Sequence, residues 1–215
     1  MGQLTKSDTR PVAFFDFDGT LTIDDSLMPF LKYVVGTPTY YAKLALVSPV
    51  RAALVANLLR NDIAKQIFLR QYLAGYHIDD LFEQGQRFSE EVIPTMLRPE
   101  GIERLRRHQE KGHECVLVSA SMDLYLSHWS KMYGFSESLC STLSTGSGVV
   151  VSRSLVLKNC HGEEKCERIS CCITDLTQRE SYAYGDSSED LPMLHMVDNG
   201  FMLTRGEFFR VRRSS

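Results

Sequence analysis

The sequence predicts an α/β protein whose core is a Rossmann-like parallel sheet with helices on both faces, plus an inserted α-helical cap domain and a β-hairpin. Short, almost wholly apolar runs recur along the chain, which is typical of strands buried on both faces of a sheet. Helical patterns separate these runs, and this alternation predicts parallel strands joined by right-handed crossovers. The long interval between the first two runs has helical periodicity only, which indicates an insertion.

The apolar runs define the expected strands of the core. A helical pattern over Pro99–Lys111 precedes the second run, and Gly112 supplies its stop signal. A short helix around Asp190–Met196 separates the last two runs. The expected strands are Val12–Phe17, Cys115–Val118, Ser181–Tyr184 and Gly200–Leu203.

The predicted insertion divides the chain into two units. Pro94 and Pro99 mark its exit and Thr22–Asp25 its entrance. We therefore expect a discontinuous core, residues 1–21 and 97–215, and a helical cap, residues 22–96. Later in the chain, Gly146-Ser147-Gly148 lies between β-branched runs, so Leu139–Leu157 is expected to form the hairpin. The helical patterns of the insertion are Ser26–Val35, Tyr40–Leu59, Ile63–Ala74 and Asp79–Val92.

Composition and charge exclude several classes of function. The 215 residues include 24 Lys and Arg against 27 Asp and Glu, and the net charge of −3 gives no general attraction to nucleic acid or anionic membranes. No apolar stretch has the length of about 18 uncharged residues that a spanning helix needs. Met1–Arg10 is polar and lacks the apolar core of a signal peptide, so we expect the cysteines to be reduced and the protein to be cytoplasmic. The cysteine spacings do not repeat a paired C-x-x-C pattern, and no thiol metal site is expected.

Two carboxylates follow the first expected strand. Asp16 and Asp18 stand two residues apart, and the period-2 geometry of a strand directs both side chains to the same side. Gly19 allows the backbone to turn tightly and approach a ligand, at the carboxyl end of a parallel sheet where such folds bind ligands. A solvated turn rich in Asp is the alternative for this segment considered alone.

Ser119 follows the second expected strand and precedes Ala120, Ser121 and a helix. Its hydroxyl and the next amides, including that of Ala120, are therefore expected at the same sheet edge, with a helix N-terminus behind them. This setting suits an anion. Capping of the helix over Met122–Tyr133 is the alternative role for Ser119 and the favoured role for Ser121.

A lysine and two more carboxylates are expected at the same edge. Lys165 lies in the first turn of a predicted helix, where the helix dipole disfavours a cation, so a negative group is expected nearby. Lys158, at the end of a hairpin strand, is a weaker candidate for the same role. Asp186 closes the third strand, and Asp190 falls in the first turn of the next helix. Routine capping explains one acidic helix start, but not several carboxylates converging beside a serine and a lysine.

This set of residues resembles the haloacid dehalogenase superfamily of phosphohydrolases, and the resemblance covers the whole core. The helical insertion after the first motif is similar to the cap of the phosphoserine-phosphatase-like branch. The four motifs of the superfamily match, in order, Asp16-Phe17-Asp18-Gly19-Thr20, Ser119, Lys165 and Gly185-Asp186-Ser187-Ser188-Glu189-Asp190.

The resemblance implies a reaction. Asp16 is the implied nucleophile, and Asp18 is the implied general acid and base. Ser119, Ala120 and Lys165 are the implied phosphate holders. The physical chemistry agrees, because a phosphate dianion repels a carboxylate nucleophile until positive groups neutralise its charge.

The resemblance also implies Mg²⁺ as the cofactor. Its ligands would be Asp16, Asp186 and the backbone carbonyl of Asp18, while Asp190 would orient Lys165 or a metal-bound water. Mg²⁺ prefers oxygen ligands, which these residues supply.

The resemblance leaves the substrate open. Phosphoserine phosphatases carry a Glu that helps to bind the substrate amino group, and at the equivalent place this sequence has Asp25, with Asp24 beside it. Arg51, Arg60 and Arg70 are candidates for a carboxylate binder, although surface positions are the simpler account of all three.

The expected function is therefore that of a Mg²⁺-dependent phosphomonoesterase that hydrolyses a small phosphorylated metabolite through an aspartyl-phosphate. The alternatives are a lipid-phosphate (phosphatidylglycerophosphate-like) phosphatase, a phosphotransferase, or a non-catalytic phospholigand-binding protein. The apolar stretch Tyr40–Leu59 suits a lipid, but packing within the cap explains it more simply, so membrane surface contact is not favoured. Neither the oligomeric state nor the packing of Arg205–Ser215 follows from the sequence.

Overall fold

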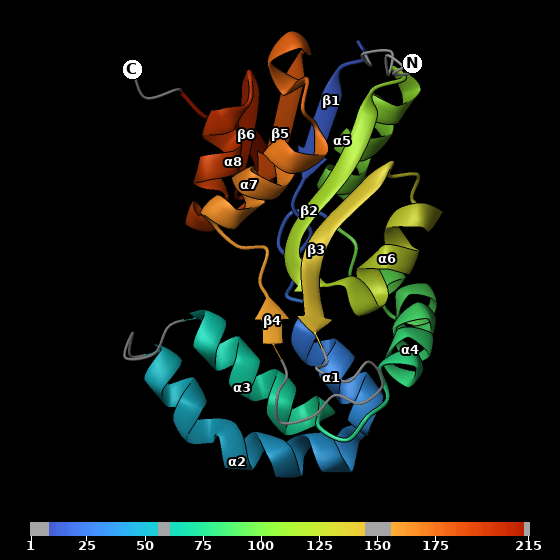
Figure 1. Ribbon diagram of the computed structural model, residues 1–215, viewed down its shortest axis with the longest axis vertical. Helices are drawn as coiled ribbons and strands as arrows, with labels where there is room; N and C mark the ends of the chain where they lie inside the picture. Colours follow the sequence, from blue (N-terminus) through green and yellow to red (C-terminus); the bar gives the residue numbers. More distant parts are fainter. Residues whose placement is uncertain (1–8, 56–60, 145–155, 213–215) are drawn as a thin grey trace, which may run out of the picture.

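The computed structural model describes residues 9–55, 61–144 and 156–212. Within these ranges seven strands form one sheet in the order β4-β3-β2-β1-β5-β6-β7 (Figure 1). The strands are β1 (Val12–Phe15), β2 (Glu114–Met122), β3 (Glu137–Ser144), β4 (Val156–Lys158), β5 (Ser181–Gly185), β6 (Asn199–Thr204) and β7 (Glu207–Arg210). The helices are α1 (Leu27–Val35), α2 (Thr37–Val55), α3 (Asn61–Leu73), α4 (Ile78–Glu91), α5 (Pro99–Glu110), α6 (Asp123–Met132), α7 (Glu163–Cys172) and α8 (Leu191–Met196).

The central strands are parallel, as their apolar sequences predict. Phe15 of β1 lies opposite Leu117 of β2 on one side and opposite Tyr184 of β5 on the other. Every residue of β1 is buried. The carboxyl ends of β1, β2 and β5 therefore meet at one edge of the sheet.

Helices cover both faces of the sheet, because alternate residues of a strand point to opposite sides. On one face Phe15 shares a buried cluster with Trp129 of α6 and with residues of α5. On the other face Phe14 shares a separate cluster with Ile169 of α7 and with residues of α8. The fold is thus the predicted α/β arrangement, and Trp129 is fully buried in it.

The expected helical insertion between the first two strands consists of α1–α4; α1–α3 lie beyond the carboxyl end of the sheet, and α4 packs beside α6 (Figure 1). Its aromatic side chains pack on the core. The rings of Phe30 from α1 and Phe88 from α4 lie 4.8 and 5.4 Å from the ring of Tyr125 on α6. Residues 56–59 of the predicted second helix lie outside the described residues. None of the described helices is both long and apolar enough to cross a membrane.

The chain enters and leaves the insertion through paired segments. Thr22 forms an antiparallel bridge with Leu97, and the N–H of Ile23 donates a 2.8 Å hydrogen bond to the carbonyl of Met96. The Arg98 guanidinium donates to the carbonyl of Thr22 at 3.3 Å. The expected boundaries adjoin this bridge, and the division into a core and a cap stays a prediction.

Antiparallel strands form the outermost pair on each side of the sheet. β3 pairs with β4, with Thr142 opposite Lys158, so the strands of the expected hairpin form; its Gly146-Ser147-Gly148 turn lies outside the described residues. β6 pairs with β7, with Phe201 opposite Arg210. The sequence did not predict β7, which continues the sheet after a turn with positive φ at two consecutive residues.

Candidate active site

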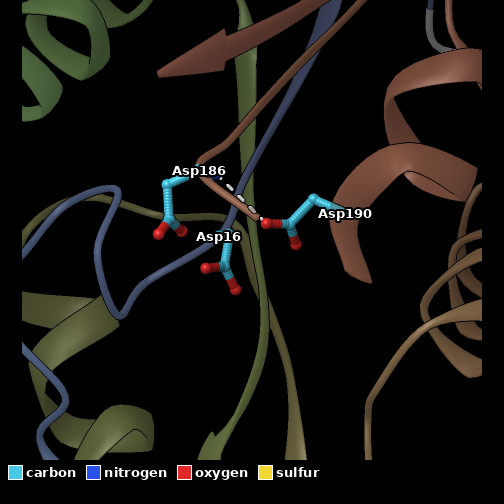
Figure 2. Close-up of side chains that lie close together, drawn as sticks. All are labelled: Asp16, Asp186 and Asp190. Atoms are coloured by element: carbon cyan, nitrogen blue, oxygen red, sulfur yellow. Dashed lines mark hydrogen bonds between the residues drawn. The ribbon is translucent and has the colours of Figure 1, made fainter. Parts of the chain in front are cut away.

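Polar side chains gather at the carboxyl ends of the neighbouring strands β1, β2 and β5. Asp16 follows β1, Asp186 follows β5, and Ser119 lies near the end of β2. Figure 2 shows the carboxyl groups of Asp16 and Asp186 next to that of Asp190, which comes from the turn before α8. The sheet edge therefore collects the acidic residues that the sequence placed there.

A buried lysine joins two of these carboxylates. Lys165 Nζ, from the first turn of α7, donates 2.6 Å hydrogen bonds to Oδ1 of Asp16 and to Oδ1 of Asp190. The side chain of Lys165 is only 3% exposed. The negative group that the helix dipole predicted near this lysine is therefore a pair of carboxylates. The competing Lys158 is a residue of β4 whose side chain lies outside the described residues.

The cluster carries more negative than positive charge. Burial raises the pKa of Asp16 well above its usual value, and Lys165 offsets only part of this effect. Burial also raises the pKa of Asp186, and Asp190 adds to it. Burial alone would lower the pKa of Lys165, but the two carboxylates outweigh it and raise the pKa, so the ammonium stays charged. The excess of carboxylates over ammonium groups favours the binding of a cation.

Asp190 is held by its own loop. Its Oδ2 accepts 3.1 Å hydrogen bonds from the N–H groups of Asp186 and Ser187; the first is the dashed line of Figure 2. Ser187 Oγ donates to the same oxygen at 3.0 Å. Because Oδ1 is bonded to Lys165, both oxygens of Asp190 have protein partners. This geometry suits a residue that orients Lys165 better than it suits a metal ligand.

The carboxylates can hold a hard divalent cation. One oxygen from each of Asp16, Asp186 and Asp190 lies within 4.8 Å of the others, and Mg²⁺ prefers oxygen ligands of this kind. The close approach depends on Gly19, where φ is +78° and a Cβ would lie 2.2 Å from Asp186 Oδ2. Thr20 Oγ1 donates to Asp186 Oδ1 at 3.1 Å. Asp16 and Asp186 are the better ligand candidates, because Asp190 is already engaged.

The end of β2 forms an irregular segment beside the carboxylates. The register of β2 with β3 shifts between Ser119 and Met122, which indicates a bulge. The N–H of Ser121 donates a 3.0 Å hydrogen bond to Ser119 Oγ. The hydroxyl of Ser121 donates to Asp18, and α6 begins at an N-cap, Met122, that makes no side-chain cap bond. The prediction that Ser121 caps this helix is therefore wrong, because its hydroxyl bonds to a carboxylate instead.

Asp18 lies between this segment and the start of α1. Its Oδ1 accepts a 2.8 Å hydrogen bond from the N–H of Ser26. Burial and, to a smaller extent, the charge of Asp25 raise the pKa of Asp18 to about 6, although hydrogen bonds from Ser121 and Ser26 oppose the shift. A carboxyl group with this pKa exchanges a proton near neutral pH, as a general acid and base must.

A cavity of about 420 Å³ opens beside Asp18. The inserted helices supply an apolar wall that includes Met28 and Phe68. The core supplies a polar wall that includes Ser121 and Asn159. The cavity therefore offers both apolar and polar contacts to a molecule bound next to the carboxylates.

Asp25, expected to meet a substrate amine, lines this cavity. Its Oδ1 also accepts hydrogen bonds from the N–H groups of Leu27, at 2.9 Å, and of the following residue, at 3.4 Å, at the start of α1. Among the arginines considered as carboxylate binders, Arg70 is exposed and does not line the cavity. Arg60 and the side chain of Arg51 lie outside the described residues.

The structure adds Lys65, which the sequence analysis did not single out. Lys65 projects from α3, lines the cavity and donates to the backbone carbonyl of Ala120. No local pattern distinguishes it from a solvated lysine on an amphipathic helix. The contact joins residues that are 55 positions apart, so only the fold reveals it.

Comparison with known proteins decides the family. The profile of the haloacid dehalogenase-like hydrolases matches residues 13–195. The chain belongs to the haloacid dehalogenase-like hydrolase family. This hydrolase is 31% identical to protein CicA of Caulobacter vibrioides, over 90% of its own length and 86% of CicA. It is 25% identical to phosphoserine phosphatase SerB1 of Mycobacterium tuberculosis, over 88% of its own length and 63% of SerB1.

A solved structure supports the fold independently. A Bordetella pertussis protein of unknown function superimposes with a TM-score of 0.75 at 23% identity, over 88% of each chain. The family match confirms the resemblance that rests on the four motifs. It also confirms the expected enzyme class, a haloacid dehalogenase-like phosphatase.

Proposed function

We propose that this phosphatase is a Mg²⁺-dependent phosphomonoesterase that hydrolyses a small phosphorylated metabolite through an aspartyl-phosphate formed on Asp16. The observation that carries the proposal is the 2.6 Å pairing of Asp16 with Lys165, next to Asp18 with its pKa of about 6. Lys165 favours the ionised form that a carboxylate nucleophile needs, whereas Asp18 can carry a proton near neutral pH. Because burial raises the pKa of Asp16, the assignment of Asp16 to attack relies on positive charge from Lys165 and from a bound cation, whereas Asp18 suits proton transfer.

The proposed reaction has two displacements. Asp16 attacks phosphorus and displaces the alcohol, whose oxygen takes a proton from Asp18. Asp18, now ionised, then takes a proton from the water that attacks the aspartyl-phosphate, which releases phosphate and restores Asp16. The Ser119 hydroxyl, the Ala120 N–H and the Lys165 ammonium are assigned to hold the phosphoryl oxygens.

Mg²⁺ is the cofactor that suits the carboxylate cluster. We assign Asp16 and Asp186 as its side-chain ligands, together with the backbone carbonyl of Asp18, and Asp190 as the residue that orients Lys165. When bound, the ion supplies positive charge that offsets the repulsion between a phosphate dianion and Asp16.

The inserted helices, residues 22–96, are proposed to act as a cap, and residues 1–21 and 97–215 as the catalytic core. Support comes from the cavity wall, to which α1 contributes Met28 and α3 contributes Phe68. These apolar side chains would shield the alcohol part of a bound ester from water. The volume of about 420 Å³ is in the range of small-molecule sites.

Asp25 supports a substrate that carries an amino group near the ester. It lines the cavity and raises the pKa of Asp18, so its negative charge acts where the alcohol would lie. SerB1, a relative, is named a phosphoserine phosphatase, and phosphoserine is an ester of this kind. The lipid-phosphate alternative has in its favour that Leu46 on α2 is 70% exposed, although the adjacent Val47 is buried.

Phosphate release from a panel of esters, with Mg²⁺ or with chelator, tests the proposal. We expect Mg²⁺-dependent release that Asp16→Asn reduces by at least about a thousandfold, because the substitution removes the nucleophile. Near-wild-type release by that variant would overturn the assignment of Asp16. If no ester is hydrolysed although phosphate still binds, the non-catalytic alternative or a transferase with another acceptor replaces the proposal.

A matched pair of esters tests the substrate class. Phosphoethanolamine and ethyl phosphate differ in the amino group, and we expect Asp25→Asn to abolish the preference for the first. Asp24→Asn is the control, because Asp24 is exposed and does not line the cavity. Hydrolysis confined to lysophosphatidic acid, together with sedimentation of the protein with vesicles, would favour the lipid-phosphate alternative.

A further inference from the structure

A single peptide group connects the inserted helices to the phosphate-binding segment. The carbonyl of Ala120 accepts hydrogen bonds from Lys65 Nζ of α3 and, at 2.5 Å, from Ser141 Oγ of β3. The N–H of the same peptide group, which belongs to Ser121, donates to Ser119 Oγ at 3.0 Å. Lys65 and Ser119 are thus bonded to opposite ends of one peptide plane.

Through this peptide group, the position of Lys65 affects the hydrogen bonds of two site residues, Ser119 and Asp18. A charged donor at a carbonyl polarises the peptide group and strengthens the hydrogen bond made by its N–H. Because Ser119 Oγ accepts that hydrogen bond, the hydroxyl proton of Ser119 is directed to another acceptor. The other end of the segment holds the general acid and base, because the Ser121 hydroxyl donates to Asp18.

A second acceptor fixes Lys65 on the core. Asn159 Oδ1 lies 3.4 Å from Lys65 Nζ and 3.0 Å from Ser141 Oγ. The same Ser141 oxygen accepts a 2.9 Å hydrogen bond from the N–H of Cys160. Lys65 therefore enters a polar network that belongs entirely to the core, although α3 is part of the insertion.

We propose that Lys65 is a positioning residue that couples the seating of α3 on the core to the phosphate-binding geometry of Ser119. The inference rests on the proposed function, because it gives Ser119 a phosphate to bind. In this role Lys65 acts through the Ala120–Ser121 peptide group and does not itself hold the phosphate. When α3 leaves its place, the carbonyl loses its charged donor and the orientation of Ser119 is no longer fixed.

The half-buried position of Lys65 beside the cavity supports a functional role. Burial lowers the pKa of this lysine, and the nearby Asp18 and Asp25 only partly compensate. An apolar residue at the same position would pack α3 without desolvating an ammonium group. Packing alone therefore does not explain a lysine at this position, whereas its hydrogen bond to the core does.

Binding of inorganic phosphate in the presence of Mg²⁺ provides the test, because this probe has no alcohol group. Lys65→Met removes the charged donor and keeps most of the volume, whereas Lys65→Arg keeps a cationic donor. Lys43→Met is the matched control, because Lys43 lies in the insertion and donates at 3.2 Å to the carbonyl of Tyr72, within the insertion. Calorimetry gives the phosphate affinity, and steady-state kinetics gives kcat and KM for two esters with different alcohols.

We expect Lys65→Met to weaken phosphate binding by about tenfold and to lower kcat/KM for both esters by the same factor, since a hydrogen bond to a charged group is typically worth this much. Lys65→Arg should recover most of the loss, and Lys43→Met should match the wild type. Unchanged phosphate affinity in Lys65→Met would overturn the proposal: a lower melting temperature alone would show a structural role, and a loss for one ester alone would show contact with the alcohol.

The failure of this inference can be told apart from the failure of the proposed function. If the wild type hydrolyses no ester, the proposed function fails, but calorimetry with inorganic phosphate still measures the effect of Lys65. If the wild type hydrolyses esters and Lys65→Met has the same phosphate affinity as the wild type, the proposed role of Lys65 fails and the proposed function stands.

Discussion

Replacement of Lys165 by Met should destabilise the folded protein strongly. The ammonium lies 2.6 Å from both Asp16 and Asp190, and the three side chains are 3%, 9% and 1% exposed. Removal of one member of a buried ion pair typically lowers the free energy of unfolding by about 3–5 kcal/mol, because it leaves uncompensated charge. For a chain of this length each kcal/mol lowers the melting temperature by roughly 2–4 °C, so a decrease of about 6–20 °C is expected.

The loss should depend on pH in a defined direction. Asp16 already has a raised pKa, and removal of the ammonium raises it further, because Lys165 is the group that lowers it. A carboxyl group whose pKa is higher in the folded than in the unfolded state favours folding when it is protonated. The deficit of Lys165→Met relative to the wild type should therefore be largest near pH 8 and shrink as the pH falls toward the usual carboxyl value of 3.8.

Urea unfolding in the presence of chelator measures this deficit without the contribution of a bound cation. The double variant Lys165→Met/Asp190→Asn removes one of the two carboxylates left without an ammonium partner and should recover about 1–3 kcal/mol of the lost free energy of unfolding. Arg168→Met is the control, because Arg168 also lies on α7 but its ion pair with Glu164 is partly exposed. A deficit below about 1 kcal/mol, or one that does not change between pH 8 and pH 5, would refute the reasoning from buried charge.

Three further outcomes follow from particular contacts. Burial and the neighbouring His113 lower the pKa of His108 to about 4, so the unfolded chain binds a proton at this residue near pH 6.5 whereas the folded protein does not. The wild type should therefore lose stability between pH 7.5 and pH 5. His108→Gln should reduce this loss, as measured by urea unfolding. Mg²⁺ should raise the melting temperature of the wild type but not of Asp186→Asn, and an equal rise in both would exclude Asp186 as a ligand. Gly85→Ala should lower the free energy of unfolding by about 1–3 kcal/mol, because the new Cβ would lie 2.0 Å from the carbonyl of Leu124; an unchanged urea midpoint would contradict this close packing.

The part of the site that lies at strand ends could be predicted from the sequence. Asp16 and Asp186 each follow a short apolar run, and parallel strands bring such positions to one edge. Lys165 was found from its unfavourable place in a helix dipole, a local signal that the two carboxylates explain. In each case the functional side chain lies within a few residues of the strand or helix that positions it, so a local sequence pattern is enough to predict its place.

The contacts that the sequence did not reveal join distant segments. Lys65 and Ala120 lie on different elements, and nothing near Lys65 marks it as different from other helix lysines. The local sequence predicts a helix cap for Ser121, but its hydroxyl donates a hydrogen bond to Asp18, which is 103 positions away. The sequence does not reveal β7 for another reason: Glu207–Arg210 is four residues long with a charged residue at each end, so it lacks the wholly apolar run that identifies the central strands.

The insertion is attached to the core by contacts of two physical kinds, and they have different consequences. At Gly85 the backbone of α4 approaches that of α6 so closely that no side chain fits, and such packing fixes where the insertion sits. At Lys65 the contact of α3 is polar, and water can replace the donor when the helix moves away. This second contact reaches the peptide group whose N–H donates to Ser119. The apolar contact therefore sets the location of the insertion, whereas the polar contact is the one through which we propose that the geometry of Ser119 depends on whether α3 is in place.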